Sequence, residues 1–274
     1  MRTFHLSVAL CASLVSAACF NSSTTIRIKG DGSGTIEQTT LLTAAAMAQM
    51  RQLAAMSGEN GKPLDLFSAD QAQQMASALG PDVKLVSSKP VKNADGEGNV
   101  MMFSFTDVTK LHLNQQPSLP GGVAVDAPGV QKKAEEVKFA FSRNPDGNAV
   151  LGITMPSPKM PAVPMPTAPA GSSGAANRVS PEQLAMAKQM LGGMRLAIAV
   201  EPEGTLVKTN SPFVDGRKVT LLDLSFDQLM GNEAAFARLQ TARTPEDLRA
   251  VMKEVPGLKM TLDPQVTIEF TPGR

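Results

Sequence analysis

Few side chains in this sequence of 274 residues could do acid–base or nucleophilic chemistry. It contains two His and two Cys, and no Trp or Tyr. His112 is the imidazole that remains if the apolar N-terminal segment is removed, and an imidazole can act as a general base. Leu111 and Leu113 would point away from His112 in an extended segment, which predicts an exposed His112. Ser-His-Asp catalysis needs further partners that sequence spacing alone does not locate.

A pair of carboxylates is the other route to hydrolysis, because cleavage of a glycosidic bond needs two carboxyl groups at a suitable separation. The candidates are Asp107, Asp215, Asp223 and Asp227. Sugar sites favour large aromatic rings, and Trp and Tyr are absent. Asp215 also begins an Asp-Gly turn, and Asp227 falls in the first turn of an expected helix, where its charge suits the helix dipole. We therefore name no catalytic residue.

Three further motifs have a simpler structural interpretation. The run 30–34 (Gly-Asp-Gly-Ser-Gly) lacks the Lys-Ser/Thr and the helix of a phosphate-binding loop, so we expect a hairpin turn. The oxygen-bearing residues of 93–99 are similar to a calcium loop, but the glycine is misplaced and no distal Glu follows, so a turn is expected again. Met155, Met160 and Met165 could bind Cu(I) through thioethers. No His or Cys accompanies them, and we expect no metal site and no cofactor.

Cys19 is the residue with the most specific chemical assignment. Residues 1–18 combine a single charge, an apolar run and small residues, which is the layout of a signal peptide. The run is shorter than the roughly 20 residues that span a bilayer. The stretch 15–19 (Val-Ser-Ala-Ala-Cys) resembles the lipobox of bacterial lipoproteins, although Ser16 stands where Leu is commonest. The resemblance implies cleavage after Ala18 and a diacyl anchor on Cys19; ordinary signal-peptidase cleavage is the alternative.

Both cleavage routes place the protein outside the cytoplasm. Residues 19–23 would form a lipidated polar tether. No Asp follows Cys19, and in this respect the sequence resembles outer-membrane rather than inner-membrane lipoproteins. In a cell with two membranes we therefore expect an anchor on the periplasmic side of the outer membrane. With Cys11 removed and Cys19 acylated, the folded body has no thiol and no disulfide. The chain has 26 basic and 25 acidic residues, and this balance argues against nucleic-acid binding.

The elements that must position these residues are β-hairpins and helices. Alternating apolar residues predict hairpins at 24–40, 83–105 and 137–153, strands between 196 and 224, and a terminal hairpin at 258–270. Helical spacing of apolar residues predicts helices at 41–56, 68–79, 180–191, 226–230 and 244–255. Ser68 is the expected N-cap of its helix, with Gln71 three residues later. This pattern predicts an α+β fold with an antiparallel sheet packed with several helices.

Residues 156–178 are rich in Pro, Ala and Gly, which predicts an exposed linker or loop. It would join an α+β lobe at 24–155 to a second α+β lobe at 179–274. Periodicity does not decide between two separate lobes and one shared sheet.

Two segments resemble a loose group of exported bacterial lipoproteins of unknown function that includes the LppM-like proteins. They are the first hairpin, with its Asp-Gly-Ser-Gly turn, and 203–222, which reads Glu-Gly-Thr-Leu-Val-Lys-Thr-Asn-Ser and then Val-Asp-Gly-Arg-Lys-Val-Thr-Leu. The resemblance implies an antiparallel α+β envelope module in contact with lipid, and it transfers no functional residues.

Our first functional hypothesis is a non-enzymatic envelope lipoprotein, held on the membrane by its N-terminal lipid, whose body binds a lipid, another apolar ligand or an envelope protein. Met-rich and Phe-containing helices could line an apolar groove, although the same residues make an ordinary core. The alternative is a cell-surface hydrolase that uses carboxylates or His112, and a third interpretation is a purely structural module.

Overall fold

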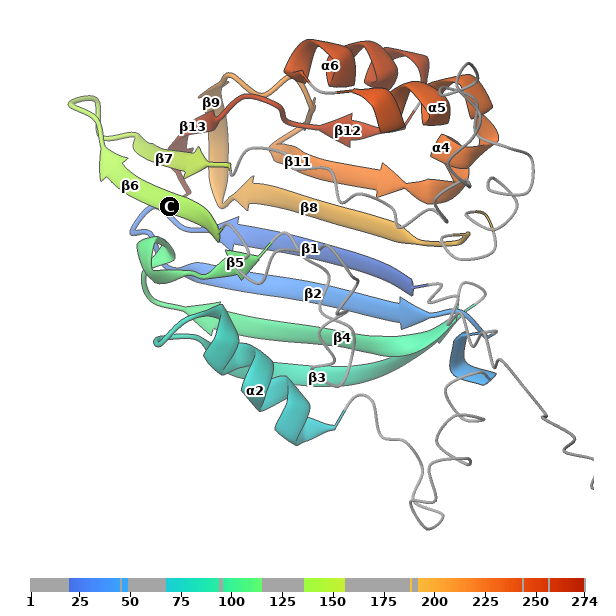
Figure 1. Ribbon diagram of the computed structural model, residues 1–274. Coiled ribbons are helices and arrows are strands. Elements are labelled where there is room, and N and C mark those ends of the chain that lie inside the picture. The colour runs from blue at the N-terminus through green and yellow to red at the C-terminus, as the bar shows by residue number, and fades with distance from the viewer. Residues whose placement is uncertain are drawn as a thin grey trace, which may run out of the picture.

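Two β-sheets make up most of the protein, and short helices flank them (Figure 1). A computed structural model describes residues 20–44, 46–48, 68–93, 96–114, 136–155, 188, 192–242, 244–255 and 257–273. The large sheet has eight strands in the order β10-β11-β8-β1-β2-β4-β3, with β12 paired to β11. These strands are β1 (Phe20–Ile28), β2 (Gly34–Leu42), β3 (Lys84–Asn93), β4 (Gly96–Phe105), β8 (Arg195–Pro202), β10 (Val214–Asp215), β11 (Lys218–Ser225) and β12 (Lys259–Met260).

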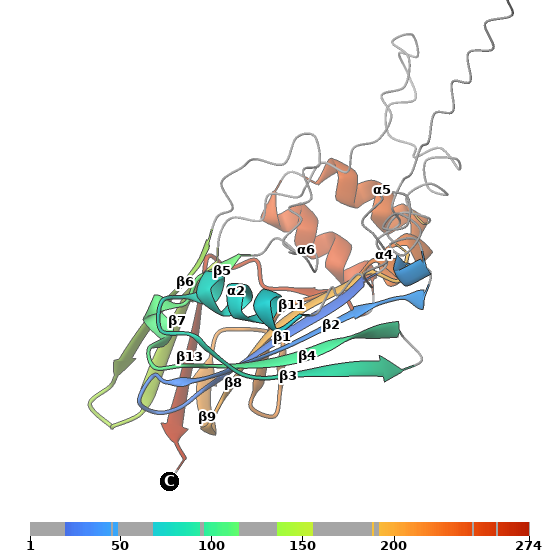
Figure 2. The same cartoon turned by 90° about the horizontal axis from the view of Figure 1, so that it is seen from below.

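The small sheet has five strands in the order β5-β6-β7-β13-β9. It lies at the end of the large sheet towards which β1 runs, and the C-terminus lies at the same end (Figures 1 and 2). Its strands are β5 (Leu113–Asn114), β6 (Glu136–Arg143), β7 (Ala149–Thr154), β9 (Gly204–Thr209) and β13 (Gln265–Pro272).

The main core forms between the sheets because both bury one row of alternating apolar side chains. In the large sheet, Ile26 of β1 is opposite Ile36 of β2, and Ile36 is opposite Phe103 of β4. Val200 of β8 lies beside Ile26 on the other side. All four side chains are 0% exposed, and they belong to one cluster with Ile268 of β13. Burial of these apolar side chains is the main stabilising contribution at this end of the molecule.

The α+β class and the three expected N-terminal hairpins are confirmed, with two differences in strand pairing. β1 and β8 are parallel, whereas the other pairs are antiparallel. The expected terminal hairpin is wrong, because β12 pairs with β11 in the large sheet and β13 pairs with β7 and β9 in the small sheet. Val266, Ile268 and Phe270 of β13 are fully buried. Alternation of apolar and polar residues predicts a strand with one buried face, but it does not predict which strand lies beside it.

Strands from both sides of segment 156–178 lie in both sheets. β8 and β11, which follow the segment, continue the large sheet beyond β1, and β9 and β13 complete the small sheet beside β7. The segment itself lies outside the described residues. At the N-terminal side, β1 begins at Phe20, so 20–23, expected as a tether, are strand residues paired with β2 and, from Asn21 on, with β8.

One helix closes the core over β3 and β4. Ser68 begins α2 (Ala69–Leu79) as predicted, and its Oγ accepts a hydrogen bond from the Gln71 backbone N–H at 3.3 Å. Ala72 and Ala76 are almost completely buried in the main core. Of the helix expected at 41–56, Leu41 and Leu42 belong to β2 instead, residues 44 and 46–48 are helical, and residues 45 and 49–56 lie outside the described residues.

Three short helices at the other end of the large sheet have a core of their own. They are α4 (Phe226–Gly231), α5 (Glu233–Thr241) and α6 (Pro245–Glu254). Leu229, Phe236 and Val251 meet in a cluster distinct from the main core. The sequence predicted α4 and α6 but not α5. Asn232 ends α4 and also caps α5, where its Oδ1 accepts a hydrogen bond from the backbone of Ala235.

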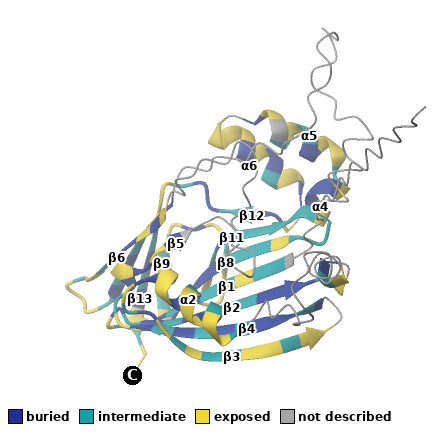
Figure 3. Cartoon of the chain, turned by 60° about the horizontal axis from the view of Figure 1, so that its bottom comes forward, coloured by how far each residue is buried: buried dark blue, intermediate teal, exposed yellow. Residues whose placement is uncertain are grey.

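The outer strands of the large sheet differ from its interior. β3 is exposed along much of its length (Figure 3), and its side chains include Lys84, Lys89 and Lys92. Pro90 lies in the same strand, and the pairing with β4 shifts register between residues 85 and 87. At the opposite edge, β10 is only two residues long.

Candidate functional site

The predicted lipidation site immediately precedes the first described strand in the sequence. Cys19 and the cleavage residue Ala18 are outside the described residues. Phe20, which follows Cys19 in the sequence, is the first residue of β1. Any group attached to Cys19 would therefore be joined to a strand that lies between β8 and β2 in the large sheet.

His112 is a surface residue, as its spacing predicted. Its side chain is 51% exposed, whereas Leu111 and Leu113 are buried. Its Nδ1 lies 3.3 Å from a carboxylate oxygen of Glu136 on β6. The imidazole thus has one exposed carboxylate partner at a strand end, a geometry typical of a surface ion pair when the His is protonated.

Asp107 has a structural partner rather than a second carboxylate. Its Oδ1 accepts hydrogen bonds from the Thr109 hydroxyl at 2.7 Å and from the Thr109 backbone N–H at 2.9 Å. These bonds cap a 3₁₀ turn, η1 (Val108–Lys110), and they lower the pKa of Asp107. Asp215 is exposed in β10, beside the turn that its Asp-Gly sequence predicted.

The other two carboxylates are also bound to separate partners. Arg195 holds Asp223 with two hydrogen bonds, from Nε and Nη2, each 2.9 Å long. Asp227 lies in the first turn of α4 and accepts a hydrogen bond from the Gly193 backbone N–H at 2.8 Å. The contacts of these Asp residues therefore give no support to a catalytic pair.

The turn and metal motifs also have structural roles. In the run 30–34, Asp31 accepts hydrogen bonds from the hydroxyl and the backbone of Ser33, which lower the pKa of Asp31. The run 93–99 joins β3 to β4. Met155 is buried in the main core, and Met160 and Met165 lie outside the described residues. Within the described part of the chain, no cluster of three or more His, Cys, Asp or Glu could hold a metal ion.

A cleft that sequence reasoning did not predict lies where β1 ends. We call it the tip cleft; its volume is about 690 Å³. Four separate parts of the chain build it: the end of β1 with the turn that follows it, the β8–β9 turn, the β10–β11 turn and the residues after β13. Its lining residues are Arg27, Lys29, Gly30, Glu203, Gly204, Arg217 and Gly273.

One carboxylate fixes two of the guanidinium groups. Glu201 of β8 contacts Arg217 Nε through one oxygen at 2.7 Å and Arg27 Nε through the other at 3.4 Å. Arg27 Nη1 also donates to Glu37 at 3.0 Å. The hydrogen bond from Arg217 lowers the pKa of Glu201, with a further contribution from Arg27, while the bond to Glu37 raises the pKa of Arg27. Glu201 and Arg27 are therefore both charged at neutral pH.

Several cationic donors remain available at the tip cleft. An Arg carries five N–H donors, and Arg217 uses only Nε for a contact within the described residues. The ammonium group of Lys29 makes no hydrogen bond or ion pair in that part of the chain, and it interacts electrostatically with the nearby carboxylate of Asp31. Glu203 is the single carboxylate among the lining residues. The lining therefore carries three positive charges and one negative charge.

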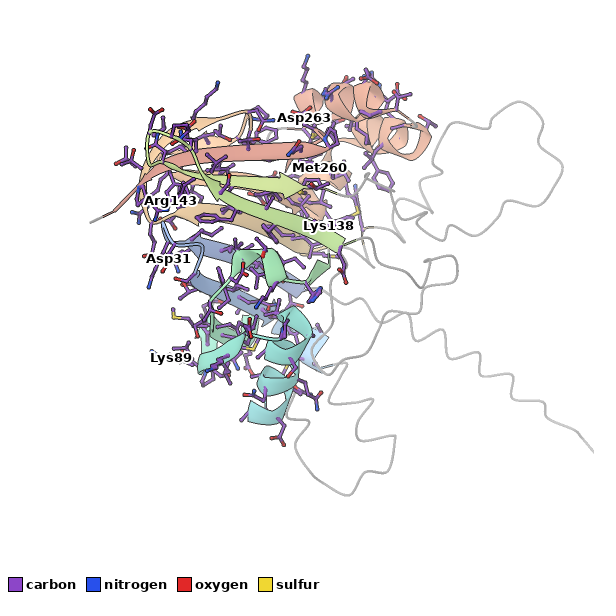
Figure 4. All side chains as sticks on the ribbon, turned by 90° about the vertical axis from the view of Figure 1, so that its left-hand side faces the viewer. Asp31, Lys89, Lys138, Arg143, Met260 and Asp263 are labelled. Carbon is purple, nitrogen blue, oxygen red and sulfur yellow. The ribbon has the colours of Figure 1, made fainter. Side chains whose placement is uncertain are left out.

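Close packing explains two of the three glycines in the lining. A Cβ at Gly204 would lie 2.1 Å from the Thr271 carbonyl oxygen, and a Cβ at Gly30 would lie 2.4 Å from a side-chain carbon of Pro272. Arg143 of the small sheet donates to the Gly30 carbonyl at 2.6 Å, and the labelled Arg143 and Asp31 mark this end in Figure 4. Because the glycines add no side chains, every side chain lining the tip cleft is charged.

The tip cleft depends on contacts between distant parts of the sequence. Arg27 and Glu201 meet because β1 and β8 pair in parallel, with these two residues in register. Both are charged residues that alternate with buried residues along their strands. This alternation predicts that their side chains point away from the core, but it does not predict which residues they contact. The Asp-Gly turn before Arg217 could be read from the sequence, but its position beside β8 could not.

No protein-family model matches the chain, and no curated protein matches it. Of the helices that the structure describes, none combines the length and apolar character needed to cross a bilayer. Among solved structures, the chain is similar to the folded domain of Mycobacterium tuberculosis LppM, determined by NMR. The two share 12% sequence identity with a TM-score of 0.29, over 76% of this chain and 83% of that chain. At this identity and TM-score the relation is a loose one.

Proposed function

We propose that the protein is an exported envelope lipoprotein, anchored through an acylated Cys19, that acts by binding rather than by catalysis. The observation that carries the proposal is the start of β1 at Phe20, directly after the cysteine of the lipobox-like stretch 15–19. A diacylated Cys19 would join the lipid to an interior strand of the large sheet without a long linker. The attachment would then restrict how the folded body is oriented on the membrane.

The proposed binding surface lies at the far end of that strand. β1 has nine residues, and a strand rises about 3.3 Å per residue, so the tip cleft is roughly 25–30 Å from the anchor. Of the helical Met and Phe side chains that could have lined an apolar groove, Met230 of α4 and Phe236 of α5 are buried in the cluster formed by the short helices. The charged tip cleft, rather than an apolar groove, supports the binding role.

The first test is native mass spectrometry of the full-length protein extracted from membranes in a mild detergent. We expect an acyl mass on the N-terminal residue of a chain that begins at Cys19. Cys19→Ser removes the acyl mass, because the hydroxyl of Ser does not replace the thiol as the acyl acceptor.

Cys11→Ser is the matched control, since Cys11 lies in the proposed leader and its loss leaves the acyl mass unchanged. A wild-type chain that begins after residue 18 without an acyl group contradicts the anchor, and so does an acyl mass that persists in Cys19→Ser.

A further inference from the structure

We infer that the tip cleft binds an oxyanion of the phosphate class, held by the guanidinium groups of Arg27 and Arg217 and by the ammonium group of Lys29. The inference concerns the ligand of the cleft and does not depend on acylation of Cys19. The lining carries three cations and one carboxylate, and no apolar side chain faces it. Glu201 and Glu37 pair with the two guanidinium groups from outside the lining, so what the cleft offers a ligand is the remaining N–H donors of two ion-paired Arg side chains and the ammonium group of Lys29. Phosphate oxygens suit such a lining because they accept several charge-assisted hydrogen bonds at once.

The ion pairs position the two Arg side chains before any ligand binds. Glu201 is half-buried, with 19% of its side chain exposed, and it holds the Nε of both guanidinium groups. The terminal nitrogens of Arg217 stay available, and that side chain is 53% exposed. A guanidinium that is already positioned loses less conformational entropy when it binds a planar or tetrahedral oxyanion.

Lys29 and Glu203 make opposite contributions to the selection of ligand charge. Lys29 follows β1, and Glu203 occupies the β8–β9 turn, where its backbone N–H donates to Ile28 and its carbonyl accepts from Gly273. These backbone bonds hold the Glu203 residue at the cleft, while its carboxylate repels an anion. Binding should therefore weaken when Lys29 or Arg217 is neutralised and strengthen when Glu203 is neutralised.

Isothermal titration calorimetry of the full-length protein in uncharged detergent micelles tests the inference. One arm uses inorganic phosphate, and the other uses glycerophosphoglycerol, the phosphodiester headgroup of phosphatidylglycerol without its acyl chains. Tighter binding of phosphate identifies a free anion as the ligand, and tighter binding of glycerophosphoglycerol identifies a lipid headgroup. Both results support the shared phosphate chemistry.

Three variants and one control decide whether the binding belongs to the tip cleft. We expect Arg217→Ala and Lys29→Ala each to weaken binding about tenfold, which is the loss of one charge-assisted contact. Glu203→Gln should strengthen it, and Lys89→Ala, on the exposed strand β3, should leave it unchanged. Higher salt should weaken binding to the wild type, because mobile ions screen the exposed charges.

The inference is overturned if neither probe binds at about 10 mM. Such a result would mean a binding free energy of less than about 3 kcal/mol. Equal losses in Lys89→Ala and Arg217→Ala also overturn it, because they would show a general effect of net charge. Each variant is checked for an unchanged far-ultraviolet circular dichroism spectrum. All four substituted side chains are exposed or lie in turns, so we expect them to fold.

Discussion

Glu201 shows how a single residue links the charge of the tip cleft to stability. Its carboxylate contacts Arg217 and Arg27, and the pKa of Glu201 is lowered in the folded protein, first by the hydrogen bond from Arg217. A carboxyl whose folded pKa lies below its unfolded value of 4.5 adds stability above that value. The contribution disappears as the pH falls through the lowered folded value.

Glu201→Gln should therefore lower the free energy of unfolding at pH 7 by about 1 kcal/mol and make it less dependent on pH in the acid range. Urea unfolding at neutral pH and at a pH below 4.5 measures both effects. Glu246→Gln is the control, because Glu246 is 75% exposed and contacts Arg249 one helical turn away. The wild type should lose more stability than Glu201→Gln between the two pH values. Equal losses in the two proteins would contradict this role of Glu201.

Gly34 is a residue at which any side chain would collide with the backbone. A Cβ there would lie 1.9 Å from the Arg27 carbonyl oxygen and 2.7 Å from the Phe105 ring. Gly34→Ala should cost about 3 kcal/mol or more, because β1 and β2 would have to move apart. Gly231→Ala, in α4 with no atom within 4 Å of the new Cβ, should be neutral or slightly stabilising. Thermal unfolding of both variants distinguishes the two sites, and equal melting temperatures would refute the collision.

At the scale of the elements, the sequence predicted what short-range interactions determine. Ser68 caps α2 as expected, the run 30–34 is a hairpin turn, and α6 begins at Pro245 after Thr244. Each depends on residues within a few positions of one another. Two features could not be predicted: the parallel pairing of β1 with β8 and the placement of β12 and β13 in different sheets. Strand pairing depends on how side chains from the whole chain pack in the core. The tip cleft was missed for the same reason.

The capping box of α6 provides an element-scale prediction. The Thr244 hydroxyl accepts a hydrogen bond from the Asp247 backbone, and the Asp247 carboxylate accepts one from the Thr244 backbone, each at 3.1 Å. Thr244→Ala should reduce the free energy of unfolding by about 1 kcal/mol. Thr244→Ser keeps the accepting oxygen and should retain most of the stability. Urea unfolding measures both, and an equal loss in the two variants would mean that the cap is not the cause.

At the scale of the whole molecule, the two sheets join parts of the chain that the segment 156–178 separates. β8 pairs with β1, and β13 pairs with β7. Neither 20–155 nor 192–274 can complete its sheets alone, because each would leave long unpaired strand edges and an exposed half of the core.

We expect 20–155 and 192–274, expressed separately, to give poorly dispersed ¹H–¹⁵N NMR spectra, and co-expression to restore a dispersed spectrum. NMR suits this protein because the chain has no Trp or Tyr to report folding by fluorescence. A well-dispersed spectrum and a cooperative unfolding transition from either segment alone would show that it is an independent domain.

The outer strands of the large sheet matter most when many copies share one membrane. Confinement to a surface raises the rate at which neighbours collide side by side, and an open strand edge invites them to polymerise through their backbones. Here one edge consists of the two-residue strands β10 and β12, which both pair with β11. The other edge is β3, where like-charged Lys84 and Lys89 repel a second copy and Pro90 offers no N–H. The register shift between β3 and β4 also interrupts the regular ladder at that edge. If the proposed anchor gathers many copies on one bilayer, these two edges would disfavour pairing between the large sheets of neighbouring molecules.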